Sequence, residues 1–484
     1  MFSFLASIAA LILGYAIYGR YIARVVYADP NRSTPATLHA DGVDYIKMPT
    51  WKVFMIQFLN IAGTGPIFGA IMGAKFGPAC FLWIVFGCIF AGAVHDYVSG
   101  IIMVRKDGFS YNEMIGYIFG KKARAIVTVL VTLLLLLVGA VFVYSPAIIL
   151  SDLVSSTSMM FWVIIIFIYY LIASLLPIDK IIGKIYPVFA VCILFMAVGL
   201  LGALLVHWPG IPEFWHGLGN RSASVGVVGQ DLFPCLFVTV ACGAISGFHA
   251  TQSPLMARCI SNEKYARPVF YGSMITEGIV ALIWAAVSSW FFFDGGMAET
   301  AAPDGQAPTV VVFVAKHWLG IVGGILAIIG VVAAPITTGD TALRSARLIV
   351  GDFLHLNQRP VKNRLAISIP IFAATILLLW YNMADAQGFN NIWRYFGWVN
   401  QTLACFTLWA LTQWLYTHTK TPHYLITMVP ALFMSAVCVS FILVDKTGAG
   451  LPSTVVPYVS AAVVLLGAFL FKVLNRNTQQ FQKL

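Results

Sequence analysis

The sequence predicts an all-α integral membrane protein with about thirteen transmembrane helices. Of its 484 residues, 60% are hydrophobic and only 10% are charged, whereas soluble domains carry about a quarter charged residues. Apolar runs of about 17 residues or more recur from end to end, and each can cross about 30 Å of hydrocarbon as a helix. Basic residues collect in alternate loops between these runs. We therefore expect one membrane domain over residues 1–484.

The transmembrane helices are expected wherever an apolar run reaches spanning length. They cover residues 2–19, 51–74, 81–104, 124–150, 160–176, 185–206, 231–257, 268–293, 318–343, 365–383, 396–417, 423–444 and 453–471. The first run lacks the positively charged start of a signal peptide, because its Arg20 and Arg24 follow it. It is expected to remain as a helix.

The distribution of charge supports an odd number of helices and predicts their orientation. If the N-terminus lies outside, only five of the 29 Lys and Arg residues also lie outside. They are Lys75, Arg221, Lys316, Arg394 and Lys446. The other 24 lie in cytoplasmic loops or at the C-terminus, as the positive-inside rule requires.

Composition also excludes several partners. The formal net charge is +10, but the basic residues are scattered and do not form a patch with interleaved aromatic residues, so no nucleic-acid partner is expected. The eight cysteines show no CxxC and no His/Cys ligand spacing. They are interpreted as small buried hydrophobic residues, and neither a metal nor a cofactor is expected. The expected partners are the lipid bilayer and a small-molecule substrate.

Two of the expected helices contain glycine-rich breaks. The first break is Ala62–Pro66 (AGTGP) and the second is Ala241–His249 (ACGAISGFH), about 180 residues later. Each broken helix is the first of a unit of five expected helices. Because five is an odd number, the two units have opposite orientations in the membrane. Paired breaks in inverted repeats indicate a transporter binding site, because unwound backbone offers free N–H and C=O groups. The alternative is that Gly and Pro only permit close helix packing.

The pattern divides the chain into a peripheral helix within 2–26, a first repeat over 51–207, an inverted second repeat over 231–417, and two accessory helices over 423–471. The accessory helices are expected to brace the core or a homodimer. The candidate substrate-binding residues are Asn60, Gly63, Thr64, Gly65, Gly243, Ala244, Ser246, Gly247, Gln252 and Gln401. For the amides Asn60, Asn400 and Gln401, hydrogen bonding between helices is an equal alternative.

Ionisable residues inside a bilayer are costly and indicate function by default. The candidates for proton coupling are His95, Asp96, His249 and Glu277, whose protonation could alternate during transport. A weaker candidate site for Na⁺ comprises Thr337, Thr338, Asp340 and Thr341, because hard cations prefer oxygen ligands. Structural roles are the alternative: Glu277 and Asp340 could pair with Arg258, Arg267 or Arg344, and the threonines could cap helices.

The same segments resemble the carbon starvation protein A family of peptide transporters. The stretches that carry the resemblance are Asn60–Gly69, Phe90–Asp96, Leu232–His249 and Thr337–Arg344. The resemblance covers most of the chain and weakens after about residue 420. It implies the amino acid–polyamine–organocation superfamily, with a LeuT-like core of five plus five helices, flanked here by one N-terminal and two C-terminal helices. It assigns no site residues.

The resemblance further implies import of small peptides or pyruvate under carbon starvation, by proton symport, across a bacterial inner membrane. The chain is shorter than the long members, and its first break reads Gly-Thr-Gly-Pro where Gly-Ala-Gly-Pro is common in the family. The choice between peptide and pyruvate therefore stays open. Two other classes are a solute-sensing receptor and a haem-bearing respiratory subunit. An enzyme is not expected, because HExxH and GxSxG motifs are absent from the sequence.

Overall fold

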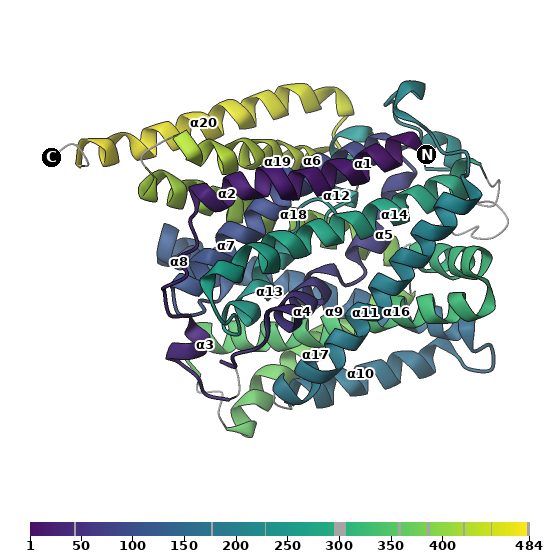
Figure 1. Ribbon diagram of the computed structural model, residues 1–484, viewed down its shortest axis with the longest axis horizontal. Helices are drawn as coiled ribbons and strands as arrows, with labels where there is room; N and C mark the ends of the chain where they lie inside the picture. The colour runs from purple at the N-terminus through teal and green to yellow at the C-terminus, as the bar shows by residue number, and fades with distance from the viewer. Residues whose placement is uncertain are drawn as a thin grey trace.

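The computed structural model describes residues 1–42, 45–175, 178–227, 229–294, 306–356, 360–384, 388–419, 422–446 and 448–481. Throughout these ranges the chain forms helices joined by loops, with no β-strand. Most of the long helices run along one common direction, and the two termini lie at opposite ends of the bundle (Figure 1). The all-α prediction is therefore confirmed for the described residues.

Nine of the described helices are long and apolar enough to cross a membrane, and a bent pair makes a tenth. The first five spans are Phe2–Val25 with α1 (Phe2–Leu13) and α2 (Gly19–Val25), Ala79–Arg105 with α6 (Ala79–Phe86) and α7 (Ala93–Arg105), Lys121–Leu153 (α9), Pro187–His207 in α11 (Ile178–His207), and Glu263–Phe293 ending in α14 (Ser273–Phe293). The other four are Gly323–Phe353 in α16 (Ala307–Phe353), Lys362–Tyr381 in α17 (Val361–Ala384), Pro422–Val444 with α19 (Leu425–Val444), and Ser453–Asn475 in α20 (Val456–Phe481). The bent pair is α4 (Thr50–Ala62) with α5 (Gly65–Ala74). These spans make the chain a multi-pass membrane protein.

The remaining predicted spans do not meet the same criteria of length and hydropathy. They correspond to α10 (Met159–Leu175), to α12 (Phe237–Thr239) with α13 (Gly247–Ala257), and to α18 (Gly388–His418). The last residue of the predicted span 160–176 lies outside the described residues. The count of thirteen spans and the division into two repeats stay predictions.

Two short helices, α3 (Pro35–Leu38) and α8 (Tyr111–Phe119), lie outside the long spans. α8 begins at a capping box, in which Ser110 and Glu113 satisfy each other's free backbone N–H groups. It ends at Phe119, and the next residue is Gly120, whose φ of +87° suits a residue without a Cβ atom. This turn leads directly into α9.

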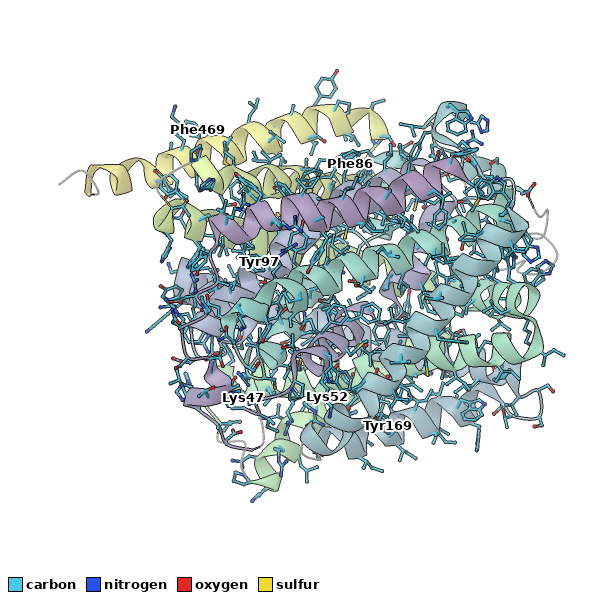
Figure 2. All side chains as sticks on the ribbon, in the orientation of Figure 1. Lys47, Lys52, Phe86, Tyr97, Tyr169 and Phe469 are labelled. Atoms are coloured by element: carbon cyan, nitrogen blue, oxygen red, sulfur yellow. The ribbon has the colours of Figure 1, made fainter. Side chains whose placement is uncertain are left out.

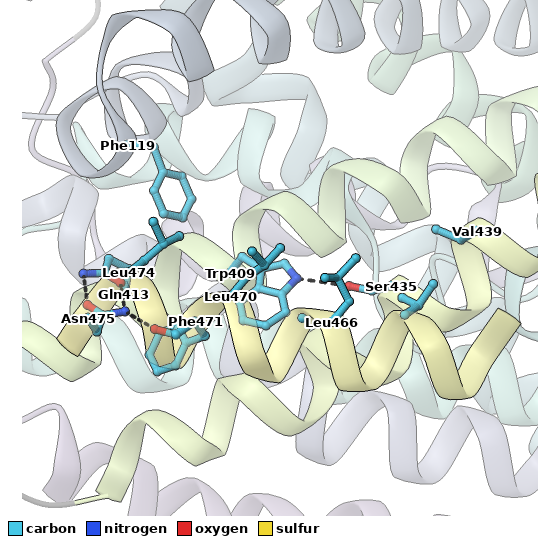
Figure 3. Close-up of a pocket in the computed structure, with 12 residues that line it drawn as sticks. Phe119, Trp409, Gln413, Ser435, Val439, Leu466, Leu470, Phe471, Leu474 and Asn475 are labelled. Carbon is cyan, nitrogen blue, oxygen red and sulfur yellow. Dashed lines mark hydrogen bonds between the residues drawn. The ribbon is translucent and has the colours of Figure 1, made fainter. Parts of the chain in front are cut away.

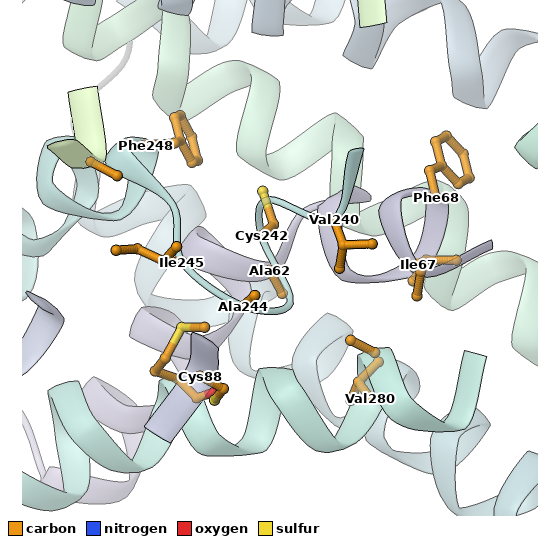
Figure 4. Close-up of a cluster of buried hydrophobic side chains, with 14 of the residues drawn as sticks. Ala62, Ile67, Phe68, Cys88, Val240, Cys242, Ala244, Ile245, Phe248 and Val280 are labelled. Carbon is orange, nitrogen blue, oxygen red and sulfur yellow. The ribbon is translucent and has the colours of Figure 1, made fainter. Parts of the chain in front are cut away.

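Both predicted breaks are confirmed. α4 ends at Ala62 and α5 begins at Gly65, with a bend of 45° at Gly63, where φ is +48°. The second break is wider, because α12 ends at Thr239 and α13 begins only at Gly247. Its unwound backbone passes beside the first break and over α14 (Ser273–Phe293) (Figure 4).

Burial separates core helices from peripheral ones. In the spans Ala79–Arg105 and Glu263–Phe293, 83% of the apolar window is buried, whereas in Ser453–Asn475 none of it is. α20 (Val456–Phe481) packs on α19 (Leu425–Val444) and exposes a row of apolar side chains. Phe469 and Phe86, both labelled in Figure 2, are 62% and 55% exposed. Such an apolar exterior suits lipid contact.

An apolar groove runs between α18, α19 and α20, away from the two breaks. Trp409, Leu466 and Phe471 are among its lining residues, and the Trp409 indole donates to Ser435 Oγ at 3.0 Å (Figure 3). At one end the amides of Gln413 and Asn475 exchange two hydrogen bonds of 2.9 and 3.0 Å. These bonds join α20 to α18.

Candidate substrate and coupling site

Glycines let the second break lie against its neighbours. A Cβ atom on Gly65 of α5 would lie only 2.3 Å from the Cys242 Sγ, and one on Gly92 would lie 2.3 Å from the Ala244 carbonyl oxygen. Real Cβ atoms do not approach other atoms so closely. The unwound segment can therefore contact α5 on one side and the π-helical turn Gly87–Gly92 on another.

Side chains from other helices satisfy the polar backbone of both breaks. The Trp83 indole donates to the Val240 carbonyl at 2.9 Å, and Gln401 Nε2 donates to the Phe237 carbonyl at 2.8 Å. At the first break, Thr338 Oγ1 donates to the Leu59 carbonyl at 3.3 Å. Inside a bilayer, a backbone carbonyl that is not bonded within its helix needs a hydrogen-bond donor from another part of the protein. Gln401, predicted to bind substrate, thus joins two helices through its amide nitrogen.

Asn400 of α18 caps α13. Its Oδ1 accepts hydrogen bonds from the Phe248 backbone N–H at 2.8 Å and from the Ser246 hydroxyl at 3.1 Å. An N-cap side chain usually belongs to the helix it caps, but here it comes from a distant helix. Sequence reasoning left Asn400 open between binding and helix pairing, and the structure gives it this structural role.

Several predicted substrate-binding groups are buried and have no hydrogen-bond partner within the part of the chain that the structure describes. They are both amide atoms of Asn60, the Thr64 hydroxyl, Gln252 Oε1 and Gln401 Oε1. Each such group costs about 1–3 kcal/mol if it stays unsatisfied. These groups are therefore available to a ligand or to water.

The two breaks are closed against each other. The gap between Gly65 and Cys242 is also lined by Trp393 and Phe396 of α18, and it has no room for a water molecule. The predicted residues Gly63, Gly243, Ala244, Ser246 and Gly247 lie in or directly beside the two breaks. A substrate would enter this gap only after the helices separate.

The four predicted proton-coupling residues form one buried cluster. Asp96 of α7 (Ala93–Arg105) lies at its centre: its Oδ1 is 2.8 Å from His95 Nδ1, and its Oδ2 is 2.9 Å from His249 Nδ1. His249 Nε2 is 3.4 Å from Glu277 Oε2 of α14. All four side chains are 0% exposed. The cluster connects α7, α13 and α14 immediately after the second break.

The cluster contains atoms that can accept a proton while the hydrogen bonds to Asp96 remain in place. If Asp96 is ionised, it accepts hydrogen bonds only, so each histidine must present a protonated Nδ1 to it. The two Nε2 atoms and both Glu277 oxygens then have no hydrogen-bond partner in the described ranges of the chain. A proton could reside on His249 Nε2 or on Glu277 without breaking the bonds to Asp96.

One sequence expectation about Glu277 is wrong. It pairs with none of Arg258, Arg267 and Arg344; its ionic neighbour among the described residues is His249. Arg258 and Arg267 instead donate to the carbonyls of Gly108 and Tyr15. A sequence does not show how a helix is rotated about its own axis. In the structure, the rotation of α14 directs Glu277 towards α13.

The expectation that Asp340 pairs with an arginine is confirmed, because Arg344 lies one turn away with a nitrogen 3.9 Å from Asp340 Oδ1. The hydroxyls of Thr337 and Thr341 donate to carbonyls of their own helix, α16 (Ala307–Phe353). The hydroxyl of Thr338 reaches another helix, because it donates to the Leu59 carbonyl of α4. This geometry favours a structural role for the threonines.

Cys242 is a residue that sequence reasoning missed. It was interpreted as a small buried hydrophobic residue, yet its Sγ, His249 Nε2 and a Glu277 oxygen all lie within 4.8 Å of one another. Cys242 and His249 are seven residues apart across an unwound segment. No standard ligand spacing signals such a pair, so the folded chain was needed to reveal it.

Comparison with known proteins agrees with the resemblance in sequence. The sequence profile of the family described as carbon starvation protein CstA matches residues 1–207, 143–311 and 295–440. This chain belongs to the CstA family. A Haemophilus influenzae relative, described as an uncharacterized membrane protein, is 42% identical over 339 residues, covering 60% of this CstA-family chain and 91% of the relative.

Two further relatives have functional names. The Escherichia coli peptide transporter CstA is 24% identical, covering 89% of this chain and 78% of its own length. The Escherichia coli pyruvate/proton symporter BtsT is 28% identical, covering 59% of this chain and 48% of its own length. Both names describe transporters and not enzymes.

Among solved structures, the Eremococcus coleocola manganese transporter is similar with a TM-score of 0.59 at 14% identity, covering 91% of this chain and 99% of that one. At this identity the similarity concerns the fold alone. It supports a membrane-transporter architecture for this CstA-family protein.

Proposed function

We propose that this CstA-family protein is a secondary transporter that imports small peptides or pyruvate by proton symport, across a bacterial inner membrane, in response to carbon starvation. The observation that carries the proposal is the buried cluster of His95, Asp96, His249 and Glu277, which adjoins the second break. The names of the two Escherichia coli relatives support the substrate class.

In this proposal the chain has thirteen transmembrane helices, with the N-terminus outside and the C-terminus in the cytoplasm. Residues 51–207 and 231–417 form a LeuT-like inverted repeat. The two breaks, one in each proposed repeat, line the same gap, and this contact supports the arrangement. The peripheral helix and the two C-terminal helices flank the repeat.

The substrate site lies between the breaks. Pyruvate and peptides both carry a carboxylate, and helix N-termini favour anions. α5 and α13 both begin at a break. The Asn60 amide and the Thr64 hydroxyl, which have no hydrogen-bond partner among the residues described, supply hydrogen bonds for the rest of the substrate, with Gln252 and Gln401 as further partners. The contacts of Gly63, Gly243, Ala244 and Gly247 would then be made by backbone.

Coupling follows from the position of His249 in the first turn of α13. A movement of the second break that admits substrate also moves His249 relative to Asp96 and Glu277. The proton affinity of the cluster therefore depends on the state of the substrate site, which is what symport requires. Sodium bound by Thr337, Thr338, Asp340 and Thr341 is the alternative coupling ion, and no cofactor takes part.

The test is uptake of labelled pyruvate and, separately, of a labelled dipeptide into proteoliposomes. We expect one of them to accumulate under an inward proton gradient and not under a sodium gradient. Asp96→Asn should abolish gradient-driven accumulation while the protein stays folded. Asp107→Asn, the same change on an exposed loop residue, should leave accumulation unchanged.

Normal accumulation by Asp96→Asn would contradict the coupling role. Uptake of neither solute by folded protein would favour a solute-sensing receptor. A Soret band in the absorbance spectrum of the same preparation would indicate the haem-bearing alternative.

A further inference from the structure

We propose that Cys242, His249 and Glu277 form a binding site for one transition-metal dication of the zinc class. This inference goes beyond transport and departs from the expectation that the chain holds no metal. It rests on the positions of three ligand atoms from the second break, from α13 and from α14: Cys242 Sγ, His249 Nε2 and a Glu277 carboxylate oxygen.

The distances between these atoms suit tetrahedral coordination. For typical Zn–N and Zn–O bonds of about 2.0–2.2 Å, a tetrahedral angle separates the two ligand atoms by about 3.4 Å. His249 Nε2 and Glu277 Oε2 are 3.4 Å apart. With a Zn–S bond of about 2.3 Å, the sulfur should lie about 3.6 Å from the nitrogen. All three atoms lie within 4.8 Å of one another, so the thiol needs to approach by at most about 1.2 Å.

The histidine is oriented as a metal ligand. Its Nδ1 lies 2.9 Å from Asp96 Oδ2, so the other nitrogen presents its lone pair to Cys242 and Glu277. This carboxylate–histidine arrangement fixes the tautomer and raises ligand basicity in many metal sites. His95 Nδ1, 2.8 Å from Asp96 Oδ1, holds that carboxylate in turn.

Two of the three ligands, His249 and Glu277, have ligand atoms with no hydrogen bond to any described residue. His249 Nε2 and both oxygens of Glu277 are buried and have no hydrogen-bond partner among the described residues. The Cys242 sulfur has two polar neighbours that could stabilise a thiolate: Asn400 Nδ2 at 3.8 Å and the Ser246 hydroxyl at 3.6 Å. The imidazole nitrogen and the carboxylate therefore keep lone pairs available to a metal ion, within 4.8 Å of the sulfur.

The ligand set selects the kind of metal. One sulfur and one imidazole nitrogen with a single carboxylate suit zinc and its neighbours, whereas magnesium and calcium need more oxygen ligands. Three protein ligands leave a fourth position for water, as in open zinc sites. Bound metal would also compete with a proton for His249 Nε2; this consequence for uptake rests on the proposed function, but metal binding itself does not.

The experiment uses the purified full-length protein with Zn²⁺ or Co²⁺ as the probe, and it requires no transport. We expect one Zn²⁺ per chain, a zinc X-ray absorption spectrum that fits one sulfur with nitrogen and oxygen ligands, and a Co²⁺ spectrum with a thiolate charge-transfer band. Cys242→Ser should remove the charge-transfer band, whereas Cys405→Ser, a change at a thiol between α18 and α19, should preserve it. Asp96→Asn should weaken Zn²⁺ binding by about 10- to 100-fold.

Absence of stoichiometric Zn²⁺, or zinc without a sulfur ligand in the unaltered protein, would overturn the proposal. The X-ray absorption result decides the question even if Cys242→Ser fails to fold. If the protein binds zinc but takes up no solute, the metal site is supported and the proposed function is contradicted. If it takes up solute but binds no zinc, the proposed function is supported and the metal site is contradicted.

Discussion

Substitution of Gly92 by alanine tests whether close backbone contact holds the second break in place. The added Cβ would lie 2.3 Å from the Ala244 carbonyl oxygen and 2.9 Å from Met274 Cε. The methionine end can move, but the carbonyl belongs to the unwound backbone. That carbonyl must retreat by about 0.7 Å even to reach 3.0 Å, the lower limit for a real Cβ contact.

The expected cost follows from two opposing effects. Overpacking of a well-packed core costs about 1–3 kcal/mol, while alanine is favoured over glycine in a helix by about 0.5–1 kcal/mol. The net effect is a loss of about 1–2 kcal/mol in the free energy of unfolding. Because Ala244 belongs to the proposed substrate site, uptake should fall as well.

Gly202→Ala in α11 (Ile178–His207) is the matched control, because its Cβ would meet no atom of the described residues within 4 Å. It should stabilise the protein by about 0.5–1 kcal/mol and leave uptake unchanged. Unfolding free energies can be measured by steric trapping in bicelles, and melting temperatures by scanning fluorimetry in detergent. If Gly92→Ala is as stable and as active as Gly202→Ala, close contact between the π-helical turn and the break is not what holds this segment.

Two other perturbations address the cap of α13 and the N-terminus. Asn400→Ala leaves the Phe248 N–H and the Ser246 hydroxyl without their acceptor, so it should cost about 2 kcal/mol of unfolding free energy. Thr402→Ala, which removes a bond to the Trp398 carbonyl of its own helix and a weak contact with the Cys438 thiol, caps no helix and should cost less than half as much; equal losses would refute the capping role. Although burial opposes ionisation of Glu213, hydrogen bonds from the Met1 ammonium group and from Ser3 lower the pKa of its carboxyl group. Its stabilising contribution should therefore be complete above the ordinary glutamate pKa of 4.5 and disappear as the pH falls through the lower folded value. The melting-temperature difference between the unaltered protein and Glu213→Gln should shrink below pH 4.5; a difference that grows there would contradict the assignment.

The sequence was sufficient to predict the helices and both breaks, because apolar length and Gly-rich interruption are local properties. Asp96 and His249 were also identified, since an ionisable residue in an apolar run stands out wherever it occurs. Their meeting at hydrogen-bond distance was not predictable, because it depends on how α7 and α13 are rotated about their axes.

The errors and omissions have the same origin. Pairing with an arginine was the structural alternative for Glu277, but rotation of α14 gives it His249 as its ionic neighbour among the described residues. Cys242 was classed as apolar since its neighbours in sequence are small and apolar. Only the unwound path from Val240 to Ser246 turns its sulfur towards a histidine seven residues later.

The polarity of α18 has a consequence for biosynthesis. Its 31 residues would reach about 46 Å, yet it is not apolar enough to count among the spans recognised by hydropathy. The side chains responsible include Asn400 and Gln401, whose amides bond to the second break. At the translocon a polar helix enters lipid poorly by itself, so α18 should insert only when earlier helices are present to receive these amides. Substitutions that add polarity to α18 should therefore lower the yield of inserted protein before they change the stability or the uptake activity of the protein that does insert.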